Sequence, residues 1–165
     1  MATLPHIIFD ILVIGAGATI VMDAWLLLLK RLGVPVGNFA MIGRWVGHLV
    51  QGRFRHAAIA RSSPIPAELP LGWLIHYGVG IAYAALLVAM QGSRWPQQPS
   101  LAPALAVGIG TVVVPLFVMQ PAMGAGMAGA KTPSPWRNCL RSVANHTVFG
   151  LGLYLAAVAL AALSR

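Results

Sequence analysis

Four long apolar stretches, separated by shorter polar segments, set the pattern of this sequence. They cover about residues 7–31, 71–90, 101–119 and 139–163. A helix of about 20 apolar residues is long enough to cross the hydrocarbon core of a bilayer. The pattern therefore predicts an all-α integral membrane protein with four transmembrane helices, folded as a single membrane domain over residues 1–165.

The two longer connections, residues 32–70 and 120–138, carry patterns of their own. Residues 38–50 have apolar side chains at helical spacing but are too few to span a bilayer, which predicts an amphipathic helix at the membrane interface. The second connection is rich in glycine, and we expect a short interfacial or partly unwound helix there. Pro115 and Pro121 predict a kink or break in the third apolar stretch, because proline removes a backbone donor.

Composition argues against a water-soluble fold. The chain is 58% hydrophobic and 8% charged, whereas soluble domains carry roughly 25% charged residues. The net charge of +8 arises mainly in residues 32–70 and 120–138, so the positive-inside rule places both loops in the cytoplasm. We therefore expect a bacterial inner-membrane protein with both termini in the periplasm, and no nucleic acid is needed to explain the charge. The predicted contacts to anionic lipids are Arg44, Arg53, Arg55 and Arg61.

Polar side chains occur inside the predicted spans. Asp23, one of three acidic residues in the chain, precedes Lys30 by roughly 10 Å of helix. Polar groups facing lipid are costly, so we expect such side chains to face one another or a wet cavity near the cytoplasmic side. Asp10, near the outer end of the first span, is expected at the membrane interface. The predicted cluster consists of Asp23, His76, Gln120, Asn145 and His146.

Three interpretations of this cluster remain open. The side chains could be a structural lock that fixes helix register, or a proton or ligand site, because histidine titrates near neutral pH. In a third interpretation His76 and His146 bind a metal or haem, although no local ligand spacing supports it, and we predict no cofactor or metal. Met119, Met123 and Met127 recur every four residues, and we interpret them as apolar contacts rather than a Cu(I) site.

Several short motifs resemble one known family. They are Gly17-Ala-Thr19, Met22-Asp23, Gly43-Arg44-Trp45, Gly47-His48, Gly52-Arg53-Phe54-Arg55-His56, Gly72-Trp73, His76-Tyr77, Met119-Gln120-Pro121, Gly124-Ala125-Gly126, Lys131-Thr132-Pro133, and His146 with Phe149-Gly150-Leu151-Gly152. Across nearly the entire chain, they resemble the bacterial membrane family known as domain of unknown function 2938. The resemblance implies a small four-helix inner-membrane protein and transfers no catalytic residues. It also suggests that the basic segment 44–56 and the Gln120 region matter as a unit.

Two classes of function fit the sequence. No serine-nucleophile motif and no paired carboxylates occur in it, which favours a non-enzymatic protein. The first class is an accessory or scaffold subunit that packs small-residue helix faces against a larger membrane complex. The alternative is a small proton-coupled transporter or ligand-binding protein that uses the polar cluster. We expect it to be a homo-oligomer, because four helices enclose little volume. The small-residue pairs, which also suit contacts within the bundle, are Gly78/Ala82, Gly80/Ala84, Ala104/Gly108, Ala106/Gly110 and Gly152/Ala156.

Overall fold

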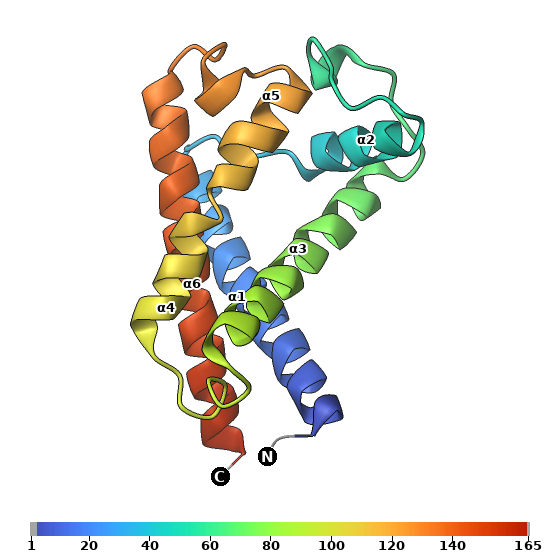
Figure 1. Ribbon diagram of the computed structural model, residues 1–165. Coiled ribbons are helices and arrows are strands. Elements are labelled where there is room, and N and C mark those ends of the chain that lie inside the picture. The colour runs from blue at the N-terminus through green and yellow to red at the C-terminus, as the bar shows by residue number, and fades with distance from the viewer. Residues whose placement is uncertain (1–2, 165) are drawn as a thin grey trace. The chain divides into compact units, whose positions relative to one another are not determined.

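The computed structural model describes residues 3–164, and every regular element in this range is helical (Figure 1). Four helical segments within it are long and apolar enough to cross a membrane, which confirms the prediction of an all-helical chain with four such segments. They are Leu4–Arg31, Glu68–Gln91, Leu101–Met123 and Pro135–Leu163. The elements are α1 (Leu4–Arg31), α2 (Phe39–Val50), η1 (Ile59–Arg61), α3 (Glu68–Gln91), α4 (Leu101–Gly110), η2 (Pro115–Met119), α5 (Gln120–Met123), η3 (Met127–Gly129) and α6 (Pro135–Leu163).

The chain forms two compact units. Unit 1 contains the residues up to Pro35, residues 77–111, and those from Asn145 onwards. Unit 2 contains residues 36–76 and 112–144. Helices α3 and α6 each begin in unit 2 and end in unit 1.

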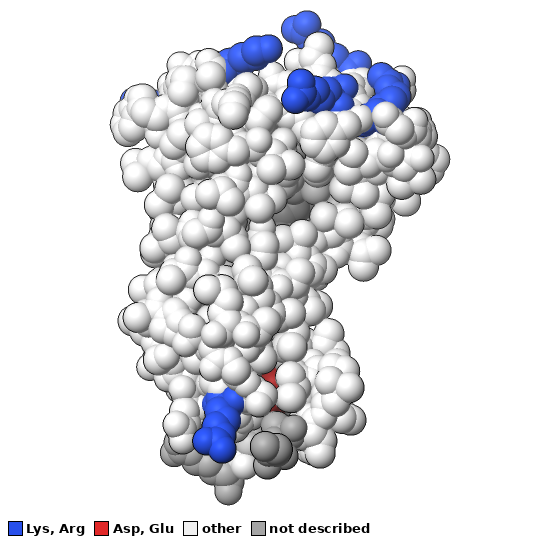
Figure 2. Space-filling model, in the orientation of Figure 1, with Lys and Arg blue, Asp and Glu red and all other residues white. Residues whose placement is uncertain are grey.

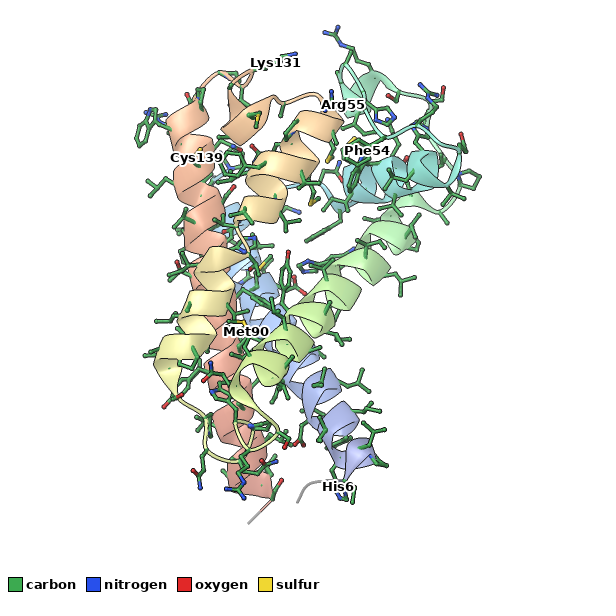
Figure 3. The ribbon with its side chains drawn as sticks, viewed as in Figure 1. His6, Phe54, Arg55, Met90, Lys131 and Cys139 are labelled. Atoms are coloured by element: carbon green, nitrogen blue, oxygen red, sulfur yellow. The ribbon has the colours of Figure 1, made fainter. Side chains whose placement is uncertain are left out.

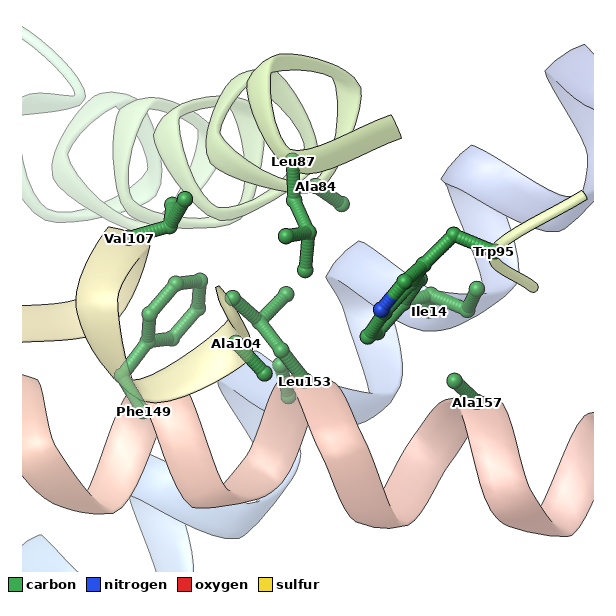
Figure 4. Close-up of a cluster of buried hydrophobic side chains, with 10 residues drawn as sticks. Ile14, Ala84, Leu87, Trp95, Ala104, Val107, Phe149, Leu153 and Ala157 are labelled. Atoms are coloured by element: carbon green, nitrogen blue, oxygen red, sulfur yellow. The ribbon is translucent and has the colours of Figure 1, made fainter. Parts of the chain in front are cut away.

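Unit 1 is held together by an apolar core to which all of its helices contribute (Figure 4). Ile14 and Leu153 are fully buried, and Phe149 is 4% exposed. The indole of Trp95, from the turn between α3 and α4, closes one end of this core and donates its N–H to Ser100 Oγ. The core residues are Ile14, Ala18, Ala84, Leu87, Trp95, Ala104, Val107, Phe149, Leu153 and Ala157.

Glycine allows the helices of unit 1 to approach one another closely. A Cβ atom on Gly15 of α1 would lie 2.5 Å from Ile81 Cα of α3. On α4, a Cβ atom on Gly108 would lie 2.5 Å from Gly150 Cα of α6. Neither position tolerates a side chain without moving backbone, which is the role that small residues have in contacts between membrane helices.

The third apolar segment departs from α-helical geometry in the region where the sequence predicts a kink. Helix α4 ends at Gly110, a turn follows at Thr111, and the chain then forms the π-helical turn η2 before α5. Pro115 has no N–H, and its ring would clash with the carbonyl of Thr111 in a regular α-helix. A π-helical turn is one way in which a helix accommodates such a break.

Unit 2 is built on contacts between α2 and the start of α3. The side chain of Asn38 caps α2 by accepting the N–H of Ala40 at 2.9 Å. A Cβ atom on Gly43 would collide with the carbonyl of Glu68, and one on Gly72 would collide with that of Phe39. A small apolar core then joins α2 to η1 and α5. It consists of Trp45, Ile59 and Ala122, with Met41, Val46, Leu49, Met119 and Met123 partly buried around it.

We expect Gly108→Ala to lower the free energy of unfolding by about 1–3 kcal/mol, because the added methyl group forces α4 and α6 apart. Gly110→Ala is the matched control. A Cβ atom at Gly110 meets nothing within 4 Å among the described residues, so this variant should be neutral or slightly stabilising. The measurement is reversible unfolding in detergent, followed by circular dichroism. Equal effects of the two substitutions would contradict the close approach of α4 and α6.

Candidate functional site

Polar side chains of unit 1 pair across its helices. The Tyr77 hydroxyl on α3 donates to Asp23 Oδ2 on α1 at 2.9 Å. The Trp25 indole N–H, also on α1, donates to Asn145 Oδ1 on α6 at 2.9 Å. Each bond joins two helices of membrane-crossing length, so Asp23 and Asn145 both have a partner that fixes helix register.

His146 lies at the contact between α6 and the end of α4. Its Nδ1 lies 3.1 Å from the main-chain oxygen of Gly108 and 3.1 Å from Thr111 Oγ1. A carbonyl only accepts, so Nδ1 carries the proton and donates it to Gly108. The Thr111 hydroxyl also donates to the Gly108 carbonyl, at 2.8 Å. His146 thereby satisfies backbone at the point where α4 ends.

Two residues of the predicted cluster, His76 and Gln120, belong to unit 2. The Asn138 amide donates to Gln120 Oε1 at 2.9 Å. The His76 ring lies 4.4 Å from the Phe39 ring and 5.7 Å from the Trp73 ring, centroid to centroid. Asp23, Asn145 and His146 belong to unit 1. The meeting of all five side chains in one cluster stays a prediction.

Arg44 forms an ion pair within unit 2. Its Nε and Nη2 donate to the two carboxylate oxygens of Glu68, both at 2.8 Å. Its Nη1 lies between 3.0 and 3.4 Å from three carbonyls of the loop after α2. The residue is 7% exposed, and the hydrogen bonds to Glu68 raise the pKa of its guanidinium. The Arg44 guanidinium group thereby joins α2, the following loop and the first turn of α3. The carbonyl acceptors belong to Ile59, Ala60 and Ser62.

Two buried histidines stack beside this ion pair. His48 Nδ1 lies 2.8 Å from His56 Nε2, and His48 Nε2 lies 3.1 Å from the main-chain oxygen of Ser63. The Ser63 carbonyl can only accept, so His48 Nε2 carries a proton. In a neutral pair His48 Nδ1 is then an acceptor, and His56 Nε2 donates to it. That assignment leaves His56 Nδ1 as a lone pair.

His56 Nδ1 is the one buried side-chain nitrogen or oxygen in the described residues for which no hydrogen-bond partner is found. The residue is 8% exposed. Its main-chain N–H donates to the Ala122 carbonyl at 2.8 Å. Gly124, with φ of +97°, lets the end of α5 approach, because a Cβ there would collide with the carbonyl of Ala57. The backbone therefore holds the imidazole in place while one ring nitrogen is left unsatisfied.

A basic pocket of about 440 Å³ opens beside His56. Figure 2 shows Lys and Arg side chains gathered over the loops of unit 2, and Figure 3 marks Arg55 on the loop after α2. The three arginines of the pocket are exposed, and the described residues offer them no carboxylate partner. The main lining residues are Arg53, Arg55, His56, Arg61, Ser62 and Ser63.

The surroundings of His56 disfavour its charged form. Burial lowers the pKa of His56 below its ordinary value, and the nearby His48 and Arg53 lower it further. The nearby main-chain carbonyl of Ala122 acts in the opposite direction, because its partial negative charge favours a protonated ring. The pocket therefore favours the neutral form of the imidazole.

Sequence reasoning did not single out His48, His56 or the environment of Asp10. Asp10 is 9% exposed, and its Oδ2 accepts the Gln97 amide at 3.0 Å, while its place at the membrane interface stays a prediction. It lines a second pocket of about 870 Å³ in unit 1. Two signals were available for the histidines: Arg44 and His48 are spaced to lie on one face of α2, and both histidines occur in the motifs that resemble the family. No pattern in the loop predicts that His56 folds back onto that face.

Met119, Met123 and Met127 do not lie along one continuous helix. Met119 and Met123 pack against the core of unit 2, but α5 ends at Met123, and Met127 in η3 is 58% exposed. No group of three or more His, Cys, Asp or Glu side chains that could hold a metal ion occurs within residues 3–164.

The architecture defines a helical protein with four helices of membrane-crossing length and a basic unit of shorter helices and loops. The chain belongs to the family described as "Protein of unknown function (DUF2938)", whose model matches residues 12–160. No curated protein and no solved structure matches the chain. The family match confirms the resemblance carried by the sequence motifs.

We expect Arg44→Gln to lower the unfolding midpoint by several degrees, because it leaves the Glu68 carboxylate without its partner and three carbonyls without a donor. The double variant Arg44→Gln/Glu68→Gln should recover part of that loss, since it removes the unpaired charge. Thermal unfolding of the full chain in detergent measures both effects. A double variant less stable than Arg44→Gln would contradict the ion pair.

Proposed function

We propose that this chain is an integral membrane protein of the bacterial inner membrane and acts as an accessory subunit of a larger membrane complex. The four apolar helices support insertion, because each is long enough to cross the hydrocarbon core. Unit 2 carries seven Lys and Arg residues and a single acidic residue, Glu68. The positive-inside rule places such a unit in the cytoplasm and both termini in the periplasm. Helix α2 then lies at the cytoplasmic interface.

The accessory role is supported by a difference in burial among the small-residue pairs. Gly80/Ala84 and Ala104/Gly108 are buried within unit 1. Gly78/Ala82 on α3 and Ala106/Gly110 on α4 are exposed instead. A Cβ atom on Gly78 or Gly110 meets nothing within 4 Å among the described residues. Small residues at i and i+4 let another membrane helix approach closely, so we assign these two faces to transmembrane helices of a partner protein.

The alternative, a proton-coupled transporter or ligand-binding protein that uses the predicted cluster, has less support. The contacts of Asp23, Asn145 and His146 are hydrogen bonds that join helices, which favours the structural lock among the three interpretations. Non-enzymatic function remains our proposal. Arg44 is paired with Glu68, so we keep the proposal of anionic-lipid contact for the three exposed arginines, Arg53, Arg55 and Arg61.

Reporter fusions test the topology. We expect alkaline phosphatase to be active, and green fluorescent protein dark, when fused after the last residue or inserted in the turn after α3. Fusions within the loop after α2 should give the opposite result. An active phosphatase within that loop would contradict the cytoplasmic placement of unit 2.

Mild detergent extraction from native membranes tests the accessory role. We expect the wild-type chain to copurify with one defined membrane protein in fixed ratio, and Gly78→Leu and Gly110→Leu to abolish that association. Leu69→Ala, which changes an exposed apolar position on the opposite side of α3, is the control and should retain it. Recovery of a stable homo-oligomer, or of a monomer alone, would contradict the proposal.

Asp23→Asn separates the two candidate functions. Asparagine still accepts the Tyr77 hydroxyl but cannot carry the charge that proton coupling needs. We expect Asp23→Asn to keep its partner and its fold, whereas Tyr77→Phe should lower the free energy of unfolding by about 1–3 kcal/mol. Copurification and unfolding in detergent measure these effects. Loss of a cellular phenotype in Asp23→Asn with both properties intact would favour transport.

A further inference from the structure

We propose that the basic pocket of unit 2 binds a phosphate-type oxyanion, and that the His48–His56 pair takes up a proton when the anion binds. The ligand class is a phosphate group, either the headgroup of an anionic membrane lipid or a soluble phosphate. The site is independent of the small-residue faces of unit 1, so its test does not depend on the accessory role.

The charge of the pocket favours an oxyanion. Arg53, Arg55 and Arg61 line it, and the only acidic side chain of unit 2, Glu68, is engaged in both of its oxygens by Arg44. Guanidinium groups donate two parallel N–H bonds to phosphate oxygens. The same charges would repel a metal cation. A volume of about 440 Å³ falls within the range of small-molecule sites, roughly 300–1,000 Å³.

The unsatisfied nitrogen of His56 points to a ligand independently of the arginines. Buried polar atoms are almost always paired, so an orphan calls for an explanation. His56 lines the pocket, and its Nδ1 is buried without a partner in the described part of the chain. Once Nδ1 carries a proton, an anion oxygen that enters the pocket, with a small shift of the ring, would supply the acceptor for it.

Proton counting links the anion to pH. His48 Nε2 needs a hydrogen for the Ser63 carbonyl, and the bond between the two rings needs one more. A neutral pair carries two hydrogens in total and has none for His56 Nδ1. One added proton gives Nδ1 a hydrogen to donate to an anion, and it places a positive charge beside the three guanidinium groups that the anion offsets.

The groups that face His56 set the direction of the effect. His48 comes from α2, Arg53 and Arg55 from its own loop, Arg61 from η1, and the main-chain carbonyl of Ala122 from α5. Without an anion the three arginines oppose protonation of His56. A bound dianion offsets two of the three arginine charges and so raises the imidazole pKa. By reciprocity, binding must tighten as the pH falls between the bound and the free pKa values.

Sulfate is the first probe, because it stays a dianion throughout the range in which histidine titrates. The measurement is calorimetry of the full chain in a neutral detergent at constant ionic strength. If sulfate raises the pKa of His56 by one unit, sulfate should bind about tenfold more tightly at low pH than at high pH. His56→Gln keeps an amide that can donate to His48 and lacks Nδ1. This variant should bind sulfate as tightly as the wild type does at high pH, but its affinity should not increase as the pH falls.

The arginines are tested by the double variant Arg53→Gln/Arg61→Gln, which should weaken sulfate binding by roughly tenfold or more at every pH. Arg94→Gln, which changes an exposed arginine of unit 1, is the matched control and should bind as the wild type does. Wild-type pH dependence in His56→Gln, or an equal loss in Arg94→Gln, would overturn the proposal.

A second arm distinguishes the two sources of phosphate. Competition of inorganic phosphate with sulfate in detergent supports a soluble ligand. Enrichment of phosphatidic acid around the wild-type chain in mixed-lipid nanodiscs, lost in Arg53→Gln/Arg61→Gln and reduced in His56→Gln, supports a lipid headgroup. If neither the soluble anions nor phosphatidic acid bind in a way that depends on these residues, the site does not exist.

Discussion

Polar groups placed where water cannot reach them must find partners inside the protein, and this constraint organises both units of the chain. In unit 1 it joins Asp23 to Tyr77 and Asn145 to Trp25 across the helices. In unit 2 it places Glu68 and a series of loop carbonyls around one guanidinium group. The same hydrogen bonds that remove the cost of burial also fix which helices lie together.

Close backbone approach is the second requirement, and it depends on glycine. Gly15 and Gly108 bring the helices of unit 1 near enough for their small apolar core to close. In unit 2, Gly43 and Gly72 do the same for α2 and the first turns of α3, which brings Arg44 within reach of Glu68. Polar pairing in each unit thus relies on backbone contacts that larger side chains would prevent.

The long elements could be predicted from the sequence because they depend on local features: the length of an apolar run, and prolines that interrupt it. The predicted start of α3 was less accurate, because the helix begins at Glu68, before the apolar run. Pro70 does not prevent this, since proline is tolerated in the first turn of a helix. The partners of the polar residues could not be predicted. A tyrosine at position 77 is as typical of a membrane interface as of a hydrogen bond to Asp23. The loop that brings His56 onto His48 is folded by contacts between residues distant in sequence.

His56 is the exception to the rule of pairing, and we interpret that exception as the mark of an anion site. The most direct test is a histidine titration of the full chain in detergent by NMR, with the His56 signal assigned from His56→Gln. Without anion we predict a pKa below the ordinary 6.5, and a rise when sulfate is added at constant ionic strength. A pKa at or above the ordinary value without anion, or one that sulfate leaves unchanged, would contradict this account.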